Sequence, residues 1–275
     1  MKERLGLDKI IPETYRGVKC PVVPVEGNNR PNSRLVLELI KYGNYFSRFG
    51  WAPEYKIEGS DKKGSSGNLG FRDEKGIVVT ATATDLGKLV PDDLMRVVNV
   101  NYGTDPPTIF YEKSGDRNPT SEFLAYDRIF SDRKDISVIL HAHNALTTER
   151  AQWLEHYSPD LVARTDEPKP YGTIDLADSL GARLTPKTRY LIANGHGFFS
   201  LGRNVSEAFI YAAEMHLSAL ILKIYSEIVE NEFVSRGLER LHLDGLVAAG
   251  SDRFAEPIMG LAGSIGGRVL DGFSS

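Results

Sequence analysis

Residues 136–143 read Ile-Ser-Val-Ile-Leu-His-Ala-His, and the expected fold is worked out from this stretch. Its apolar run has the length of a buried β-strand and ends abruptly in two histidines. Alternate residues of a strand face the same side, so His141 and His143 would project side by side. Such a buried polar end needs a partner, and two imidazole nitrogens at this spacing can reach one metal ion at about 2.0–2.1 Å. Core histidines bonded to neighbouring groups are the alternative.

A third histidine lies between glycines in the segment Asn194-Gly195-His196-Gly197. Glycine on each side lets the backbone approach other segments closely and adopt an unusual dihedral angle. A histidine in such a turn is often only a turn residue. Together with His141 and His143, however, His196 gives the three-ligand count of a catalytic zinc site with positions open for substrate.

The remaining histidines are His156, His216 and His242. None has a partner at a useful sequence spacing, and we expect His216 to pack or to face a helix surface.

Polar residues that precede a predicted helix form a second candidate group. Glu122 lies in the first turn, where backbone N–H groups favour a carboxylate, and it could also serve as a general acid or base or as a further metal ligand. Thr120 and Ser121 place hydroxyls beside free N–H groups, an arrangement that suits an anion. Asn68 and Thr82 could complete a phosphate site from two other loops, although each is by itself a common cap or turn residue.

The remaining pattern predicts a layered α/β domain. We expect helices at residues 32–46, 119–130, 173–184 and 204–231, strands at 77–82, 97–102, 136–143, 190–193 and 198–201, and a loop at 50–70. Helices interleaved with adjacent strands predict three α/β/α layers around a mixed or antiparallel sheet. The glycines at 263–267 do not join a strand to a helix, so we discount a dinucleotide-binding turn there.

The chain is expected to divide into three parts. Residues 1–31 contain four prolines and predict an extended N-terminal arm that lies on another part of the protein. Residues 32–232 form the layered domain. Residues 233–275 are weakly patterned and predict a C-terminal tail.

Composition limits the class of protein. With 41% hydrophobic and 25% charged residues, the chain resembles ordinary globular proteins, and a net charge of −4 argues against a general nucleic-acid binder. Cys20 is the only cysteine, which excludes an intrachain disulfide and a cysteine-based zinc site. Charges interrupt every apolar run near the start, and Lys223 interrupts the longest run, at 217–224. We therefore expect no membrane partner and a cytoplasmic location.

Six short motifs occur in a characteristic order along the chain. They are Ser66-Gly-Asn-Leu69, Val79-Thr-Ala-Thr82, Pro119-Thr-Ser-Glu122, Val138-Ile-Leu-His-Ala-His143, Tyr171-Gly-Thr173 and Asn194-Gly-His-Gly197. This ordered set, over about residues 33 to 230, resembles the class II aldolase/adducin superfamily.

The resemblance implies a three-layer α/β/α fold with a mostly antiparallel sheet, usually in a homotetramer. It implies that His141, His143 and His196 bind a divalent metal, Zn²⁺ first, with Mn²⁺, Fe²⁺, Ni²⁺ or Co²⁺ as alternatives. It also implies that Glu122 is the catalytic acid/base. The positions that match the phosphate-binding residues of the family's aldolases are Asn68, Thr82, Thr120 and Ser121.

Two departures from the family pattern bear on the substrate. The family usually has glycine where this chain has Ala83, whose methyl group would crowd a backbone N–H facing a phosphate. The segment between His143 and Tyr171 is shorter than in the best-known aldolase of the family, which uses a catalytic tyrosine from a neighbouring subunit. Tyr157 is the candidate for that tyrosine.

The leading hypothesis is a class II, metal-dependent aldehyde-lyase that cleaves a small, phosphorylated or hydroxylated ketose through an enediolate. The same site could serve a decarboxylase acting on a keto acid, an epimerase or a dehydratase. Epimerases of the family tend to carry aspartate at the position of Glu122, which weighs against them. A non-catalytic adducin-like interaction module is the alternative of a different class, and the retained histidines argue against it.

Overall fold

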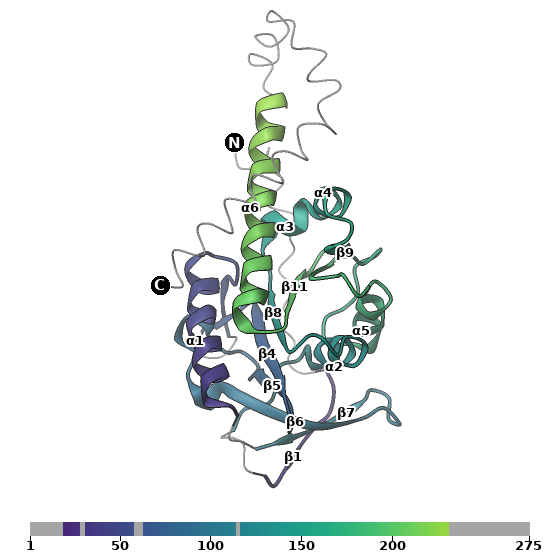
Figure 1. The fold of residues 1–275 in the computed structure, drawn as a ribbon. Helices are drawn as coiled ribbons and strands as arrows, with labels where there is room; N and C mark the ends of the chain where they lie inside the picture. The colour runs from purple at the N-terminus through teal and green to yellow at the C-terminus, as the bar shows by residue number, and fades with distance from the viewer. Residues whose placement is uncertain (1–18, 28–30, 58–62, 114–115, 231–275) are drawn as a thin grey trace, which may run out of the picture.

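A computed structural model of the chain describes residues 19–27, 31–57, 63–113 and 116–230. Within these residues, nine strands form one sheet in the order β1-β7-β6-β5-β4-β8-β11-β10-β9 (Figure 1). The strands are β1 (Val22–Val25), β4 (Gly67–Asp73), β5 (Gly76–Thr80), β6 (Leu94–Asn101), β7 (Thr108–Glu112), β8 (Val138–Ala142), β9 (Val162–Arg164), β10 (Tyr190–Ala193) and β11 (Gly197–Gly202). Only the outer pairs, β1 with β7 and β9 with β10, are parallel. The sheet is therefore mostly antiparallel, as predicted.

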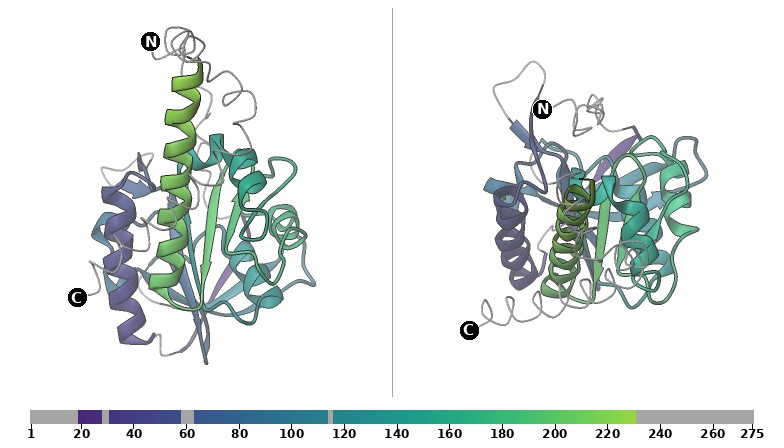
Figure 2. Two further views of the ribbon diagram at one scale, coloured as in Figure 1. Left: turned by 45° about the horizontal axis from the view of Figure 1, so that its top comes forward. Right: turned by 90° about the horizontal axis from the view of Figure 1, so that it is seen from above.

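Helices cover both faces of this sheet (Figures 1 and 2). One face carries α1 (Ser33–Arg48) and α6 (Val205–Glu230), together with the short helices α3 (Ala145–Glu149) and α4 (Ala151–Tyr157). The other face carries α2 (Phe123–Asp132) and α5 (Ile174–Gly181). Two 3-10 turns, η3 (Leu86–Lys88) and η4 (Pro91–Asp93), lie between β5 and β6. The predicted three-layer α/β/α architecture is confirmed.

Strand β8 lies in the middle of the sheet and is buried along its whole length. Its side chains alternate between two cores: Leu140 packs on the α1 and α6 side, and Ile139 packs on the α2 and α5 side. His141, two residues after Ile139, has the same parity and pairs in register with Asn68 of β4 and Phe199 of β11. The sheet thus fixes the first predicted ligand from both sides.

The predicted loop at residues 50–70 was wrong in part. It contains β2 (Glu54–Lys56) and β3 (Lys63–Ser65), which form a separate two-stranded sheet, and the first half of β4. Strand β4 was not predicted because it contains glycines, which are uncommon in strands, but close packing at these positions requires glycine. A Cβ at Gly67 would lie 2.5 Å from the carbonyl oxygen of His141, and one at Gly70 would lie 2.8 Å from that of Val78.

Strands β1, β7 and β9 and helices α3 and α4 were not predicted from the sequence. Each of these elements has seven residues or fewer, too short to show a clear hydrophobic period. Strand β1 belongs to the predicted arm: residues 19–27 are described, and Val22 of this segment pairs with Ile109 of β7. Residues 1–18 and 231–275 lie outside the described residues, so the proposed division at 31 and 232 stays a prediction.

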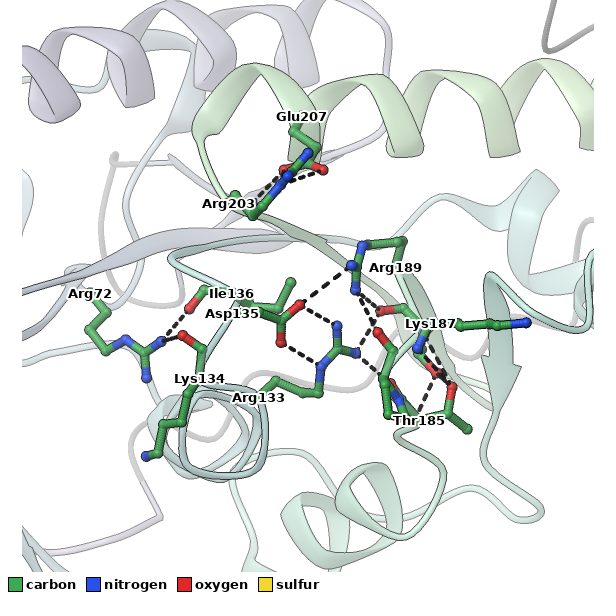
Figure 3. A network of polar contacts seen from close by, with 12 residues as sticks. Arg72, Arg133, Lys134, Asp135, Ile136, Thr185, Lys187, Arg189, Arg203 and Glu207 are labelled. Carbon is green, nitrogen blue, oxygen red and sulfur yellow. Dashed lines mark hydrogen bonds and ion pairs between the residues drawn. The ribbon is translucent and has the colours of Figure 1, made fainter.

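An arginine-rich network fixes the start of β8, at the end of the strand away from His141 (Figure 3). The guanidinium of Arg133 donates to both carboxylate oxygens of Asp135 at 2.8 Å and to the carbonyl oxygens of Thr185 and Thr188. Arg189 approaches the same carboxylate at 3.4 Å. Because Arg133 and Arg189 are already paired with Asp135, we interpret the network as structural support for β8.

Helix α6 begins as predicted, with Asn204 accepting a hydrogen bond from the backbone N–H of Glu207 at 2.8 Å. By length and composition alone, its stretch Val205–Ile224 could cross a membrane, a criterion that a helix in a protein core also meets. In the structure, 44% of that window is buried inside the protein. The buried side chains, such as Ala208 and Ala212, pack into the core beneath the sheet.

Candidate metal centre

Four side chains meet where β8 ends. His141 is on β8, and His143 is the first residue after this strand. His196 lies in the turn between β10 and β11, and Glu122 immediately precedes α2. Their ligand atoms all lie within 4.8 Å of one another. Three segments distant in the sequence therefore bring together the four residues that were predicted to bind metal or to move a proton.

Glycines hold the His196 turn against β8. Gly195 has a φ of 69°, in the left-handed region that favours glycine. A Cβ at Gly197 would lie 2.5 Å from the carbonyl oxygen of Ala142 and 3.1 Å from ring atoms of both His141 and His143. Only glycine leaves room for the three imidazoles to gather here.

The hydrogen bonds of His141 prepare it to bind a metal ion. Its Nδ1 lies 2.7 Å from the carbonyl oxygen of Phe198, which can only accept, so Nδ1 carries a proton and Nε2 is the nitrogen that faces the other candidate ligands. That Nε2 lies 3.1 Å from Nε2 of His143 and 2.9 Å from Oε2 of Glu122. Two nitrogens on one tetrahedral ion lie about 3.3 Å apart, given bonds of about 2.0–2.1 Å. The donor set fits a divalent ion.

The carboxylate of Glu122 is buried, and each of its two oxygens forms a hydrogen bond. Oε1 lies 2.5 Å from Nε2 of His196, and Oε2 accepts a hydrogen bond of 2.6 Å from Nδ2 of Asn68. Burial by itself would raise the pKa of Glu122, but the positive charges of His141 and His196 outweigh it and hold this pKa well below its ordinary value. The carboxylate is therefore ionised beside the histidines.

Burial also lowers the pKa of His143 well below its ordinary value, and the charges of His196 and His141 add to that effect. His143 is therefore a neutral imidazole, the form that binds metal ions.

Asn68 supports Glu122 in this structure. The β4–β8 register places it opposite His141, and its backbone carbonyl accepts a hydrogen bond of 2.8 Å from the hydroxyl of Tyr126. Burial and then the charge of Glu122 raise the pKa of Tyr126, so this hydroxyl stays protonated. The side-chain Oδ1 of Asn68 is buried without a hydrogen-bond partner among the described residues. It remains available to accept from a hydroxyl group.

The other predicted anion-binding residues lie on two adjoining segments. Thr120 and Ser121 are buried beside Glu122, and the hydroxyl of Thr120 accepts from the backbone N–H of Glu122 at 3.3 Å. Thr82 lies on the adjoining segment. Its backbone N–H donates a hydrogen bond of 2.8 Å to the carbonyl of Asn118. Ala83 follows with a φ of 56°, the one positive φ of a non-glycine residue in the described segments. Their binding of a phosphate stays a prediction.

Three neighbours of the centre were not proposed as functional residues. The ring of Tyr171 lies parallel to that of His196, with centroids 6.5 Å apart, and the ammonium of Lys19 lies 3.7 Å above Tyr171. Gly172 has a φ of 68°, and a Cβ there would lie 2.7 Å from the carbonyl oxygen of Ser121. The motif Tyr171-Gly172-Thr173 was the available signal for two of them, whereas Lys19 comes from the arm and gave none.

Tyr157, the candidate for a catalytic tyrosine, lies on α4. Its ring stacks on Trp153 with centroids 5.8 Å apart, and it packs against the α1 and α6 core. A catalytic role for Tyr157 stays a prediction.

Comparison with known proteins identifies a family for most of this domain. The family model described as "Class II Aldolase and Adducin N-terminal domain" matches residues 59–222, more than half of the chain. An L-fuculose phosphate aldolase of Methanococcus maripaludis is 26% identical over 156 residues, covering 54% of this chain and 78% of the relative.

A methylthioribulose-1-phosphate dehydratase of Pseudoalteromonas translucida is 22% identical over 242 residues, covering 81% of this chain and 99% of the relative. Among solved structures, an L-fuculose 1-phosphate aldolase superposes with a TM-score of 0.54 at 22% identity, covering 78% of this chain and all of that one. At this identity the structural match supports the fold alone.

Proposed function

Because the chain belongs to the class II aldolase and adducin family, we propose that it is a metal-dependent aldolase that cleaves a small phosphorylated ketose. The observation that carries this proposal is the gathering of Glu122 with His141, His143 and His196 within 4.8 Å. The three histidines would hold the ion, with zinc as the first candidate. When bound, a divalent ion supplies positive charge that stabilises negative charge developing on a substrate carbonyl oxygen.

The other residues of the site have roles that follow from their positions. Glu122 is ionised and buried, so it can take a proton from a substrate carbon or hydroxyl group and return it. The amide of Asn68 holds the carboxylate in place, and its free Oδ1 can accept from a substrate hydroxyl. Thr120 and Ser121 lie at the start of α2, where a phosphate group would be favoured.

A dehydratase acting on a related sugar phosphate is the second candidate. The observation that favours it is the long match to the methylthioribulose-1-phosphate dehydratase, which covers 81% of this chain. Elimination of water also requires proton removal beside a polarised carbonyl, so the same carboxylate and histidines would serve. The non-catalytic module is disfavoured because the acid/base carboxylate and all three histidines are present together.

Two measurements on the purified protein test the proposal. Elemental analysis should find a bound divalent metal, and a panel of ketose phosphates should release an aldehyde for an aldolase or a dehydrated ketone for a dehydratase. Carbon dioxide release from 3-keto acids would instead indicate a decarboxylase. A protein that binds no zinc, manganese, iron, nickel or cobalt would contradict the proposal.

Variants then test the role of Glu122. Glu122→Gln should lower turnover by about 10²–10⁴-fold, the usual contribution of a general acid or base. Glu149→Gln makes the same change at an exposed position and should leave turnover unaffected. Full activity of Glu122→Gln on an identified substrate would show that another group moves the proton.

We also propose that the protein assembles as a homotetramer, as the resemblance implies. Light scattering coupled to size-exclusion chromatography would test this, and a monomer at micromolar concentration would contradict it.

A further inference from the structure

Helix α6 reaches the end of β8 through a partly buried hydrogen bond. Asn144 directly follows the candidate ligand His143 and is only 5% exposed. Its side-chain amide nitrogen lies 2.7 Å from Nδ1 of His216, which comes from the middle of α6. No partner at a useful sequence spacing was expected for His216, and the partner that the structure shows lies 72 residues away in the sequence.

The direction of this hydrogen bond can be assigned. Oδ1 of Asn144 accepts from the backbone N–H of Leu146 at 3.1 Å, and a backbone N–H can only donate. The amide orientation is therefore fixed, and Nδ2 donates to His216. Nδ1 of His216 must then be the acceptor, with the ring proton on Nε2. Burial lowers the pKa of His216 and so favours this neutral form.

Further contacts fix the same corner. The backbone carbonyl of Asn144 accepts from the hydroxyls of Thr147 and Thr148, both at 3.0 Å. The ring of Trp51 lies against His216, with centroids 5.1 Å apart, so the imidazole is held in place from the α1 side. The chain immediately after His143 is thus anchored to the α1 and α6 layer.

We propose that His216 is a positioning residue that sets the metal affinity of the centre, acting through Asn144 on His143. The inference rests on the proposed function, because it requires a metal ion at the three histidines. Groups that orient metal ligands typically change metal affinity by about 10–100-fold when they are removed. His143 follows the last residue of β8 and has no strand partner among the described residues, so it depends most on such an anchor.

Three variants separate the hydrogen bond from the volume of the side chain. His216→Asn can place an amide oxygen near the position of Nδ1 and retain the acceptor. His216→Gln carries the same amide one carbon further out and removes the acceptor from that position. His216→Phe keeps an aromatic ring against Trp51 but cannot accept. Zinc affinity of the metal-free full-length protein is measured by competition with a chromophoric chelator, and folding is measured by urea unfolding of the same samples.

We expect His216→Gln and His216→Phe to bind zinc about 10–100-fold more weakly than the wild type, and His216→Asn to stay near the wild type. The spectrum of bound Co²⁺ should change in the first two variants, since it reports ligand geometry. Zinc affinity equal to the wild type in a folded His216→Gln or His216→Phe would overturn the inference, even if stability falls. A wild type that binds none of zinc, manganese, iron, nickel and cobalt would instead refute the proposed function.

Discussion

Replacement of Ala83 by glycine should make this protein more stable, although glycine usually destabilises. Ala83 has a φ of 56°, in the left-handed region where the Cβ of an L-residue costs about 1–2 kcal/mol. Glycine removes that strain but adds about 0.4–1 kcal/mol of conformational entropy to the unfolded chain. The difference predicts a net gain of about 0.5–1 kcal/mol. For a domain of this size, the melting temperature should rise by about 1–4 °C.

Ala182 offers a matched control for the same chemical change. It follows α5 with a φ of −61°, a conformation that alanine adopts without strain, and its side chain is exposed. Ala182→Gly should therefore destabilise the protein by about 0.4–1 kcal/mol, through the unfolded chain alone. Urea unfolding of the metal-free protein measures both variants under one condition. A stability loss in Ala83→Gly equal to that in Ala182→Gly would show that Ala83 is not strained.

The same variant tests the predicted phosphate site. If the backbone near Ala83 contacts the phosphate, Ala83→Gly should lower the KM for a phosphorylated substrate, because the methyl group no longer crowds the N–H. The KM for the dephosphorylated substrate should not change. Equal effects on both substrates would place the phosphate elsewhere.

Three further predictions follow from the neighbourhood of the metal centre. Burial opposes ionisation of Glu122, but the adjacent histidines outweigh it and lower its pKa in the folded protein. The ionised carboxylate should therefore stabilise the folded metal-free protein above about pH 4.5. This stabilisation should be lost as the pH falls through the pKa of Glu122 in the folded protein. The stability difference between wild type and Glu122→Gln should shrink on acidification, and a pH-independent difference would contradict this. Gly172→Ala should destabilise the protein by about 1–3 kcal/mol, because its φ is 68° and its Cβ would lie 2.7 Å from the carbonyl of Ser121; urea unfolding without such a loss would refute the close approach. Lys19→Met should raise the KM for an anionic substrate and leave kcat unchanged, with Lys19→Arg as the charge-retaining control, whereas an unchanged KM would show that Lys19 only packs on Tyr171.

The gathering of the candidate metal ligands could be predicted because each depends on a local pattern. The two-residue period of a strand places His141 and His143 on one side. The glycines around His196 indicate that the backbone of this turn approaches another segment closely. The sheet confirms this placement, since β11 and β4 flank β8 and carry the His196 turn and Asn68 to the same end. These features can be recognised from neighbouring residues and from the order of the motifs.

Other parts of the site depend on contacts that no local pattern records. Strand β4 resembles a loop because close packing requires Gly67 and Gly70. His216 resembles an ordinary helix residue, since its partner Asn144 is distant in the sequence. Lys19 belongs to a proline-rich arm that the sequence could only describe as extended. In each case the missing information is which segment packs beside which.

The candidate metal ligands and the residues predicted to bind a phosphate lie on different kinds of segment. The candidate ligands lie on or beside the central strands, and strand pairing on both sides fixes His141. The predicted phosphate donors lie in turns and are partly used already: the N–H of Thr82 is bonded to Asn118, and the hydroxyl of Thr120 is bonded to Glu122. We therefore expect substrate choice to depend on other groups near the centre, such as Ser121 and Lys19. Relatives named as an aldolase and as a dehydratase both match this chain, so the fold alone does not determine which reaction the site performs.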